Sequence, residues 1–333
     1  MIIADGLRPP APFDPSAPAY KDWLHLVVLD HRSGVAALVN VSLHGAPADP
    51  RSRAVGTALV NVPGEGWFGN VETRSLSGAV VGLTSIGLEQ VAVSVDGPRG
   101  TVHASVRQPD EGLGLDLVAH ALVRPMAREQ PQPLGSGWLA WYVVPRLRGR
   151  GRVSVAGRWI DLGQASIYYD HNWGRWHWGQ DIGWEWGCFL SPAPGPAFFL
   201  SRVTDRAQRG GTRFLHVAYP DGRQRTFAGP AVEWTRFGRL ETPLRRLPGA
   251  LAALHADLAA PHLDRALLVR ADDGNDRVEI RFTAGAAAQI IAGDPVEPGY
   301  GFIHELVGEF EFAASIGGRK EAAAGLAVVE RVY

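Results

Sequence analysis

The sequence has almost no cysteine, almost no net charge and no long apolar run. Its 333 residues include one cysteine, Cys188, so no internal disulfide can form and nothing indicates an oxidising compartment. The formal net charge is −1, which leaves no basic excess for nucleic acid or an anionic membrane surface. No apolar run approaches the roughly 20 residues of a membrane helix, and the N-terminus lacks a signal-peptide pattern. We therefore expect a cytoplasmic protein with no nucleic-acid partner and no integral membrane segment.

The common cofactor and metal motifs are also missing. The chain contains no GxGxxG and no GxxxxGK[ST], and strands do not alternate with long helices, which argues against a Rossmann or P-loop enzyme. It contains no HxH, HExxH or paired CxxC, and His171 and His177 lie six residues apart on an irregular segment, so we expect no metal site. No feature marks Cys188 as a nucleophile, and we expect it to be a small buried hydrophobe.

Turn-forming residues are abundant instead. The 40 glycines and 24 prolines indicate many turns and therefore many short elements. Strand-like runs flank these turns throughout, which predicts an all-β protein of antiparallel sheets closed into barrels or sandwiches. One stretch, Pro243–Leu258, is rich in alanine and leucine and is expected to be helical. The strand pairs are Trp23–Leu29 with Val35–His44, Val91–Val95 with Thr101–Arg107, Val153–Ala156 with Trp159–Leu162, Arg213–Tyr219 with Gln224–Ala228, and Ala266–Arg270 with Arg277–Thr283.

A proline-rich stretch predicts a domain boundary. Ser191–Pro196 holds three prolines in five residues, which excludes a central strand. We therefore expect one β domain over residues 1–190 and a second over 191–333. The tryptophan-rich segment Tyr168–Trp186 would lie near their junction, where ligand sites are common.

This segment carries the strongest functional signal. In an extended strand, Tyr169, His171 and Trp173 would share one face, with Asp170 and Asn172 on the other. Aromatic rings can hold a flat or polyene-like substrate and stabilise developing positive charge by roughly 2 kcal/mol per desolvated contact. His171, oriented by its neighbour Asp170, is the first candidate for a proton donor. Five of the eleven tryptophans lie here and are candidate pocket residues: Trp173, Trp176, Trp178, Trp184 and Trp186.

Other interpretations of this region stay open. The segment could be an aromatic corner that closes a barrel, with Asp170 and Asn172 capping turns. Glu185 lies between two tryptophans and is a secondary candidate for the catalytic acid, as is Tyr169. Glu305 lies in an apolar strand. If Glu305 faces a barrel interior, desolvation would raise its pKa. The alternative is that Glu305 faces solvent on the barrel exterior.

The motif Tyr168-Tyr-Asp-His-Asn-Trp-Gly174 resembles that of the carotenoid 1,2-hydratase family, also called AttH-like or hydroxyneurosporene-synthase-like proteins. The runs Trp141–Pro145, Gly157–Ile160 and Tyr300–Gly308 are also similar to that family. The resemblance implies two tandem lipocalin-like domains with a pocket near their contact. It also implies action without a redox cofactor on apolar, polyene-like substrates. The hydratases add water to a terminal alkene, and related fungal proteins guide Diels–Alder cyclisation.

The resemblance also bears on individual residues. The motif histidine and tryptophan, thought to be functional in the hydratases, match His171 and Trp173. The family's downstream tyrosine and aspartate have no convincing match in Phe198–Asp205, which argues against a carotenoid as the substrate.

The main hypothesis is a cofactor-independent enzyme that hydrates, isomerises or cyclises an apolar, unsaturated molecule of terpenoid or polyketide type. His171, Asp170, Glu185 and Tyr169 would be its catalytic residues. Asn172 and the tryptophans would bind the substrate. One alternative is a Diels–Alderase-type pericyclase that only folds its substrate. Others are a lipocalin-like binder of a hydrophobic ligand without catalysis, and a purely structural role for the motif.

Overall fold

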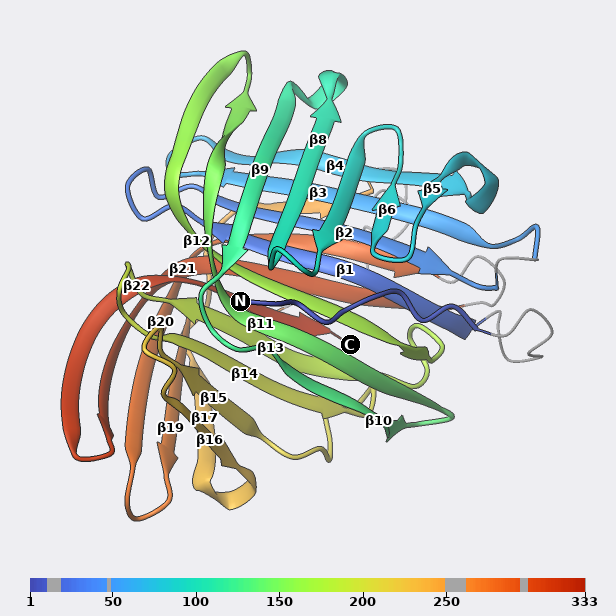
Figure 1. Ribbon diagram of the computed structural model, residues 1–333. Coiled ribbons are helices and arrows are strands. Elements are labelled where there is room, and N and C mark those ends of the chain that lie inside the picture. The colour runs from blue at the N-terminus through green and yellow to red at the C-terminus, as the bar shows by residue number, and fades with distance from the viewer. Residues whose placement is uncertain (11–18, 47–48, 249–261, 294–298, 333) are drawn as a thin grey trace. The chain divides into compact units, whose positions relative to one another are not determined.

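The computed structural model describes residues 1–10, 19–46, 49–248, 262–293 and 299–332, and these form strands with short 3₁₀ turns (Figure 1). The chain divides into two compact units: Met1–Asp181 with Gly293–Tyr300, and Ile182–Ala292 with Gly301–Tyr333. Each unit contains its own sheet, antiparallel apart from one short parallel pairing in the second, so the predicted all-β class is confirmed. Across the described ranges, no helix is long and apolar enough to span a membrane.

The first unit is a 12-stranded sheet in the order β4-β3-β2-β1-β12-β11-β9-β8-β7-β6-β5, with β10 also paired to β11. Most neighbours in the sheet are consecutive in the chain, as expected for hairpins built on Gly-rich turns. The exceptions are β12, which returns to pair with β1, and β11, which pairs with β9 as well as with β10 and β12. The strands are β1 (Tyr20–Leu29), β2 (Ala36–His44), β3 (Arg53–Val62), β4 (Gly66–Ser75), β5 (Val80–Val81), β6 (Ser85–Gly87), β7 (Val91–Asp96), β8 (Thr101–Gln108), β9 (Leu113–Ala121), β10 (Met126–Leu134), β11 (Gly137–Val155) and β12 (Arg158–Arg175), with 3₁₀ turns η2 (Leu76–Gly78) and η3 (Pro109–Glu111).

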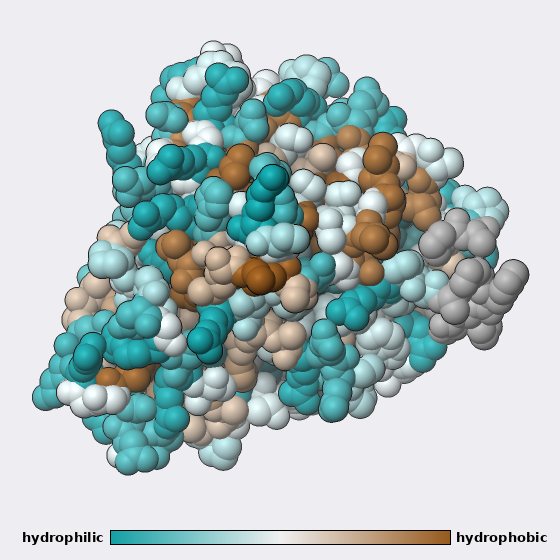
Figure 2. All heavy atoms as spheres, viewed as in Figure 1, coloured by the Kyte–Doolittle hydropathy of each residue, from teal (hydrophilic) through white to brown (hydrophobic). Residues whose placement is uncertain are grey.

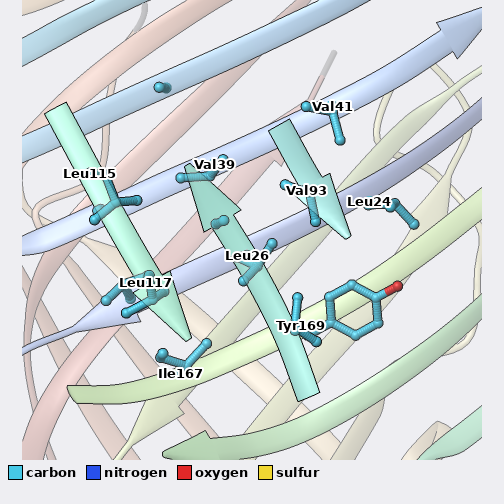
Figure 3. Close-up of a cluster of buried hydrophobic side chains, with 14 of the residues drawn as sticks. Leu24, Leu26, Val39, Val41, Val93, Leu115, Leu117, Ile167 and Tyr169 are labelled. Atoms are coloured by element: carbon cyan, nitrogen blue, oxygen red, sulfur yellow. The ribbon is translucent and has the colours of Figure 1, made fainter. Parts of the chain in front are cut away.

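The first sheet folds over on itself and encloses one apolar core. Figure 3 shows side chains of β1, β2 and β12 pointing towards those of β7 and β9, among them Leu26, Val39, Val93, Leu117 and Tyr169. Alternate residues of each strand face this core, so the apolar period of two in the sequence sets which face is buried. We call this the interior of the first sheet.

The second unit is a 10-stranded sheet in the order β16-β15-β14-β13-β22-β21-β20-β19-β17, with β18 paired to β20 in parallel. Phenylalanines from several strands fill its core with edge-to-face contacts, as between Phe198 and Phe312 at 4.8 Å. The face that carries this core is the interior of the second sheet. The strands are β13 (Gly183–Leu190), β14 (Ala197–Thr204), β15 (Phe214–Ala218), β16 (Gln224–Ala228), β17 (Val232–Phe237), β18 (Leu244–Leu247), β19 (Ala266–Asp272), β20 (Arg277–Gly293), β21 (Tyr300–Ile316) and β22 (Arg319–Val332), with the 3₁₀ turn η4 (Gly229–Ala231).

The predicted strand pairs are all present, but two other expectations differ from the structure. The helix expected over Pro243–Leu258 is wrong at Leu244–Leu247, which forms β18; residues 249–258 lie outside the described ranges. Pairing with β20 outweighs the helix propensity of this stretch there. The division expected after residue 190 would place β13 in the first domain, whereas β13 pairs with β14 and β22 of the second sheet. The prolines of Ser191–Pro196 form the turn between β13 and β14.

Candidate functional site

Strand β12 presents the motif residues to the interior of the first sheet. Tyr169, His171 and Trp173 alternate with Asp170 and Asn172 along the strand, as the sequence predicts, and all three are buried. The motif ends at Gly174, where a Cβ atom would overlap the backbone carbonyl of Trp138 on β11. This last glycine is therefore required by the close approach of β11 and β12.

His171 lies between two carboxylates. Its Nδ1 is 2.6 Å from Asp5 Oδ1, and its Nε2 is 2.9 Å from Asp22 Oδ1. The His171 and Asp22 side chains have no solvent exposure, and the Asp5 side chain is 2 % exposed. An ionised carboxylate only accepts hydrogen bonds, so two ionised carboxylates at these positions require both ring nitrogens to donate, as they do in an imidazolium.

The segment before the first strand brings Asp5 to this position. It has no regular secondary structure and is fixed by backbone hydrogen bonds from Ile3 to Gly97 (3.0 Å) and from Leu7 to Leu83 (2.8 Å). The Ile3 side chain is buried in the core of the first unit. Tyr169 Oη donates to Asp5 Oδ2 at 2.6 Å. Asp5 therefore joins the N-terminal segment to two residues of the motif.

Asp22 is held from the other side of the ring. It lies on β1 directly across from Trp173 of β12, and its Oδ2 accepts the backbone N–H of Arg8 at 2.7 Å. The Arg8 guanidinium lies 5.2 Å from the centroid of the Trp173 ring, a cation–π contact. The ring centroids of His171 and Trp173 are 4.7 Å apart. A cation, an aromatic face and two carboxylates are thus packed around one imidazolium.

The charges at this site shift its pKa values strongly. Burial alone would lower the pKa of His171, but hydrogen bonds to Asp22 and Asp5 and their negative charges outweigh it and raise the pKa to about 9. Burial would raise the pKa of Asp5, yet the hydrogen bond and charge of His171 lower it. Burial and the Asp5 charge raise the pKa of Tyr169 well above its usual value. A pKa of about 9 favours the imidazolium form of His171 at neutral pH, and in that form the ring can act as an acid and not as a base.

The structure differs from the predicted pairing of His171 with Asp170. The two residues are neighbours on a strand, so their side chains point to opposite faces of the sheet. Asp170 Oδ1 accepts a hydrogen bond from Asn172 Nδ2 at 2.7 Å. The carboxylates that contact the ring are those of Asp5 and Asp22.

Trp176, one of the predicted substrate-binding tryptophans, packs against a buried lysine and two other tryptophans. Trp176 contacts Trp23 and Trp178 edge to face, with ring centroids 5.2 Å and 5.9 Å away. Lys21 lies 5.3 Å from the Trp176 ring, and its Nζ donates to the carbonyls of Ala19 (3.0 Å) and Trp176 (2.7 Å). The sequence left open an aromatic corner with Asp170 and Asn172 capping turns, whereas these two residues lie within β12.

The remaining predicted residues belong to the second unit. Glu185 is buried on the interior of the second sheet, where it pairs with Arg202 at 3.2 Å and also with Arg236. Trp184 and Trp186 occupy the opposite face of β13, and the Trp184 indole donates to the Glu330 carboxylate. Glu185 is thus the counter-ion of two arginines.

Glu305 forms a carboxyl pair with Glu330. The two residues face each other across β21 and β22 and are hydrogen-bonded. Glu305 is buried, but it lies on the face opposite Leu306 and the core phenylalanines, not on the interior. Burial raises the pKa of Glu330, against the hydrogen bonds from Glu305 and Trp184, which lower it.

Sequence reasoning missed Asp5, Asp22, Arg8 and Tyr142. Asp5 and His171 are 166 positions apart, and no local pattern connects such distant residues. Tyr142 lies across from His171 on β11, and its Oη accepts the Ala4 N–H at 3.1 Å. Of these four residues, only Asp22 could have been proposed from the sequence, because an ionisable residue at the start of an apolar strand requires a buried partner.

A cavity of about 200 Å³ lies elsewhere on the first unit, along β6 to β9, and none of the predicted site residues lines it. Figure 2 shows hydrophobic side chains gathered over β5 and β6, where Val80, Val81 and Leu83 are exposed. Within the described ranges, no group of three or more histidine, cysteine, aspartate or glutamate side chains could hold a metal ion.

No family model matches the chain, and no curated protein matches it in sequence. Solved structures do match along almost its whole length. A candidate AttH protein from Nitrosomonas europaea has a TM-score of 0.67 at 15 % identity, covering 97 % of this chain and 98 % of that chain. Kievitone hydratase from Nectria haematococca has a TM-score of 0.64 at 12 % identity, covering 97 % and 91 %. CghA with Sch210972 has a TM-score of 0.60 at 12 % identity, covering 98 % and 94 %.

At these identities the likeness establishes a shared fold. The chain has the tandem lipocalin-like architecture of AttH and kievitone hydratase, and its fold class is the one that the motif resemblance implies. Fold alone does not fix the reaction, because one fold carries many chemistries.

Proposed function

We propose that the chain is a cofactor-independent enzyme that acts on an apolar, unsaturated small molecule of terpenoid or polyketide type by hydration, isomerisation or cyclisation. The observation that carries the proposal is the buried His171 ring, which lies within hydrogen-bond distance of both Asp5 and Asp22. A protonated, desolvated acid beside the Trp173 ring suits the protonation of an alkene, since the ring face stabilises the resulting cation. The fold shared with a hydratase is consistent with this chemistry.

Asp5 has a specific part in this mechanism. It occupies Nδ1 of His171 and lies on a segment without regular secondary structure. Displacing Asp5 frees the Nδ1 proton and removes one of the two charges that raise the pKa of His171, so the ring becomes a stronger acid. Asp22 keeps the ring in position through Nε2.

In a hydration, the Nδ1 proton adds to one alkene carbon and the other carbon becomes cationic against Trp173. Water then forms the carbon–oxygen bond, and its surplus proton returns to Nδ1. The net change is the addition of one water molecule. Loss of a carbon-bound proton from the same cation to Nδ1 would give an isomer. Attack by a second alkene would form a ring and move the positive charge onto that alkene, and loss of a proton from this new cation to Nδ1 would give the neutral cyclic product.

A Diels–Alderase-type pericyclase is the second candidate. Both N–H groups of His171 are engaged by carboxylates, which favours a fixed electrostatic role over proton donation. In that case the site only folds and polarises its substrate. A binder without catalysis would return its ligand unchanged.

Incubation of the protein with terminal-alkene terpenoids and linear polyenes, in water labelled with heavy oxygen or deuterium, separates these candidates by mass spectrometry. Hydration incorporates heavy oxygen, and isomerisation incorporates deuterium. Pericyclic cyclisation incorporates neither and gives a flat pH–rate profile.

His171→Gln tests the proposed acid, and His120→Gln, at an exposed position on β9, is its matched control. Trp173→Phe tests the contribution of the indole ring to stabilising the cation. We expect His171→Gln to reduce acid-dependent turnover about 10²-fold or more and His120→Gln to leave it unchanged. Equal turnover in His171→Gln, Trp173→Phe and the unmodified protein would contradict the assignment of the site.

A further inference from the structure

The first sheet has an outer face, opposite its interior, on which strand β11 carries a row of arginines. Leu147 and Val153 are buried in the core, so the alternation of β11 places Arg148, Arg150 and Arg152 on the outer face. All three side chains are exposed. Residues that share a face of a strand are about 6.7 Å apart along it, so three positive charges lie within about 13 Å. We call these three residues the arginine ridge.

Little negative charge lies beside the arginine ridge. Arg152 is directly across from Asp116 on β9 and Asp161 on β12, whereas the residues paired with Arg148 and Arg150 are not acidic. Over the described ranges, none of the three arginines has a carboxylate within ion-pair distance. The whole chain has a formal net charge of −1, so the positive charge of the ridge is a local feature that the total charge does not reveal.

An exposed aromatic ring lies at the end of the ridge. Trp159 on β12 is 53 % exposed, and the guanidinium carbon of Arg152 lies 4.3 Å from the centroid of its ring. Tryptophan is enriched where the head groups of a bilayer meet its hydrocarbon. Arginine suits the same depth, because its stem can lie along apolar surface while its charged end stays among the head groups.

A row of directly paired residues leads from the ridge to the edge strand β5. It runs through Arg152, Asp116, Ser105, Ala92, Gly87 and Val80, one from each of β11, β9, β8, β7, β6 and β5. Because directly paired residues share a face of a sheet, Val80 lies on the same face as the ridge. Val80 is 78 % exposed, and Leu83, between β5 and β6, is 86 % exposed. These two residues form an apolar edge, in the region over β5 and β6 where Figure 2 shows hydrophobic side chains at the surface.

We propose that the outer face of the first sheet binds the surface of an anionic lipid bilayer. The arginine ridge and Trp159 contact the head groups, and Val80 and Leu83 lie at the boundary with the hydrocarbon. The charges are complementary, because arginines within a Debye length of an anionic bilayer are attracted to it. A nucleic acid would also attract the ridge, but its phosphate backbone offers no apolar phase for Val80 and Leu83. The combination of charge and apolar edge therefore favours a bilayer.

This surface does not use His171, which is buried and faces the interior of the same sheet. The inference therefore goes beyond the proposed function and is tested separately from it. A protein bound in this way is held where apolar molecules dissolve.

Co-sedimentation of the full chain with lipid vesicles tests the proposal. One kind of vesicle is phosphatidylcholine alone, and the other contains about 30 % phosphatidylserine, whose charge attracts basic side chains. We expect binding to the anionic vesicles, at least about tenfold weaker binding to the neutral ones, and weaker binding as salt rises from about 0.1 M to about 0.5 M. No binding to anionic vesicles, or equal binding to both kinds, would overturn the proposal. So would a single-stranded oligonucleotide that binds the chain while anionic vesicles do not.

Variants then locate the surface. Arg148→Gln with Arg150→Gln should weaken binding to anionic vesicles about tenfold or more, since each arginine near such a surface contributes a factor of about five. The control, Arg319→Gln with Lys320→Gln, removes the same charge from the exposed start of β22 in the second unit and should leave binding unchanged. Leu83→Ser tests the apolar edge and should weaken binding about threefold or more.

Unaltered binding after the two ridge substitutions, or an equal loss in the control, would refute the location. His171→Gln should bind anionic vesicles as the unmodified protein does, so failure here and failure of the proposed function are distinguishable.

Discussion

Replacing Asp5 with asparagine removes one of the two carboxylates that hold the His171 imidazolium. The difference between a pKa of about 9 in the folded chain and the ordinary 6.5 corresponds to about 3 kcal/mol of stabilisation. Asp22 and Asp5 each contribute one hydrogen bond and one charge, so we expect Asp5→Asn to lower the free energy of unfolding by about 1–2 kcal/mol at neutral pH. The exposed Asp161→Asn, on the same strand as His171, is the matched control.

The pH dependence makes this prediction specific. The folded-state pKa of His171 is raised, so its stabilisation is fully present below about pH 6.5 and is lost as pH rises through about 9. Urea unfolding at about pH 7 and about pH 10 should therefore show a large difference between Asp5→Asn and the unmodified protein at the lower pH and a smaller one at the higher. The same difference at both pH values would refute the charge-based account.

Three further substitutions test other parts of the structure. Gly174→Ala should lower the melting temperature by several degrees because its Cβ would overlap the facing strand, whereas Gly163→Ala, which has open space, should not. Tyr169→Phe removes a hydrogen bond to the Asp5 carboxylate and should cost about 1–2 kcal/mol in urea unfolding; no change would show that this bond is dispensable. Glu330→Gln carries no charge at any pH. Because a raised pKa of Glu330 means that stability is lost as the pH rises, the variant should equal or exceed the unmodified protein in stability at about pH 8; a clear loss would contradict the raised pKa.

Short-range patterns predicted the strands and the faces of the motif. Each predicted hairpin, such as Val91–Val95 with Thr101–Arg107, depends on an apolar period of two and a turn within a few residues. The alternation that placed Tyr169, His171 and Trp173 on one face of β12 has the same local origin. The tandem lipocalin-like architecture was reached through the motif resemblance and is confirmed by the solved structures.

Long-range partners could not be predicted from such patterns. The expectation that Asp170 orients His171 relied on adjacency in the sequence, whereas adjacency on a strand separates two side chains. Asp5 lies in a segment without periodicity, and only folding brings it to β12. Glu185 stood out between two tryptophans, yet its partners Arg202 and Arg236 come from strands whose pairing the sequence did not reveal.

The protonation state of His171 tests the central claim most directly. Nitrogen NMR of histidine-labelled protein, with His171→Gln used to assign the signal, reports whether each ring nitrogen carries a proton. The account predicts that both nitrogens are protonated at about pH 7.5 and that the ring titrates near a pKa of about 9. A neutral ring at about pH 7.5 would contradict a buried acid held by Asp5 and Asp22.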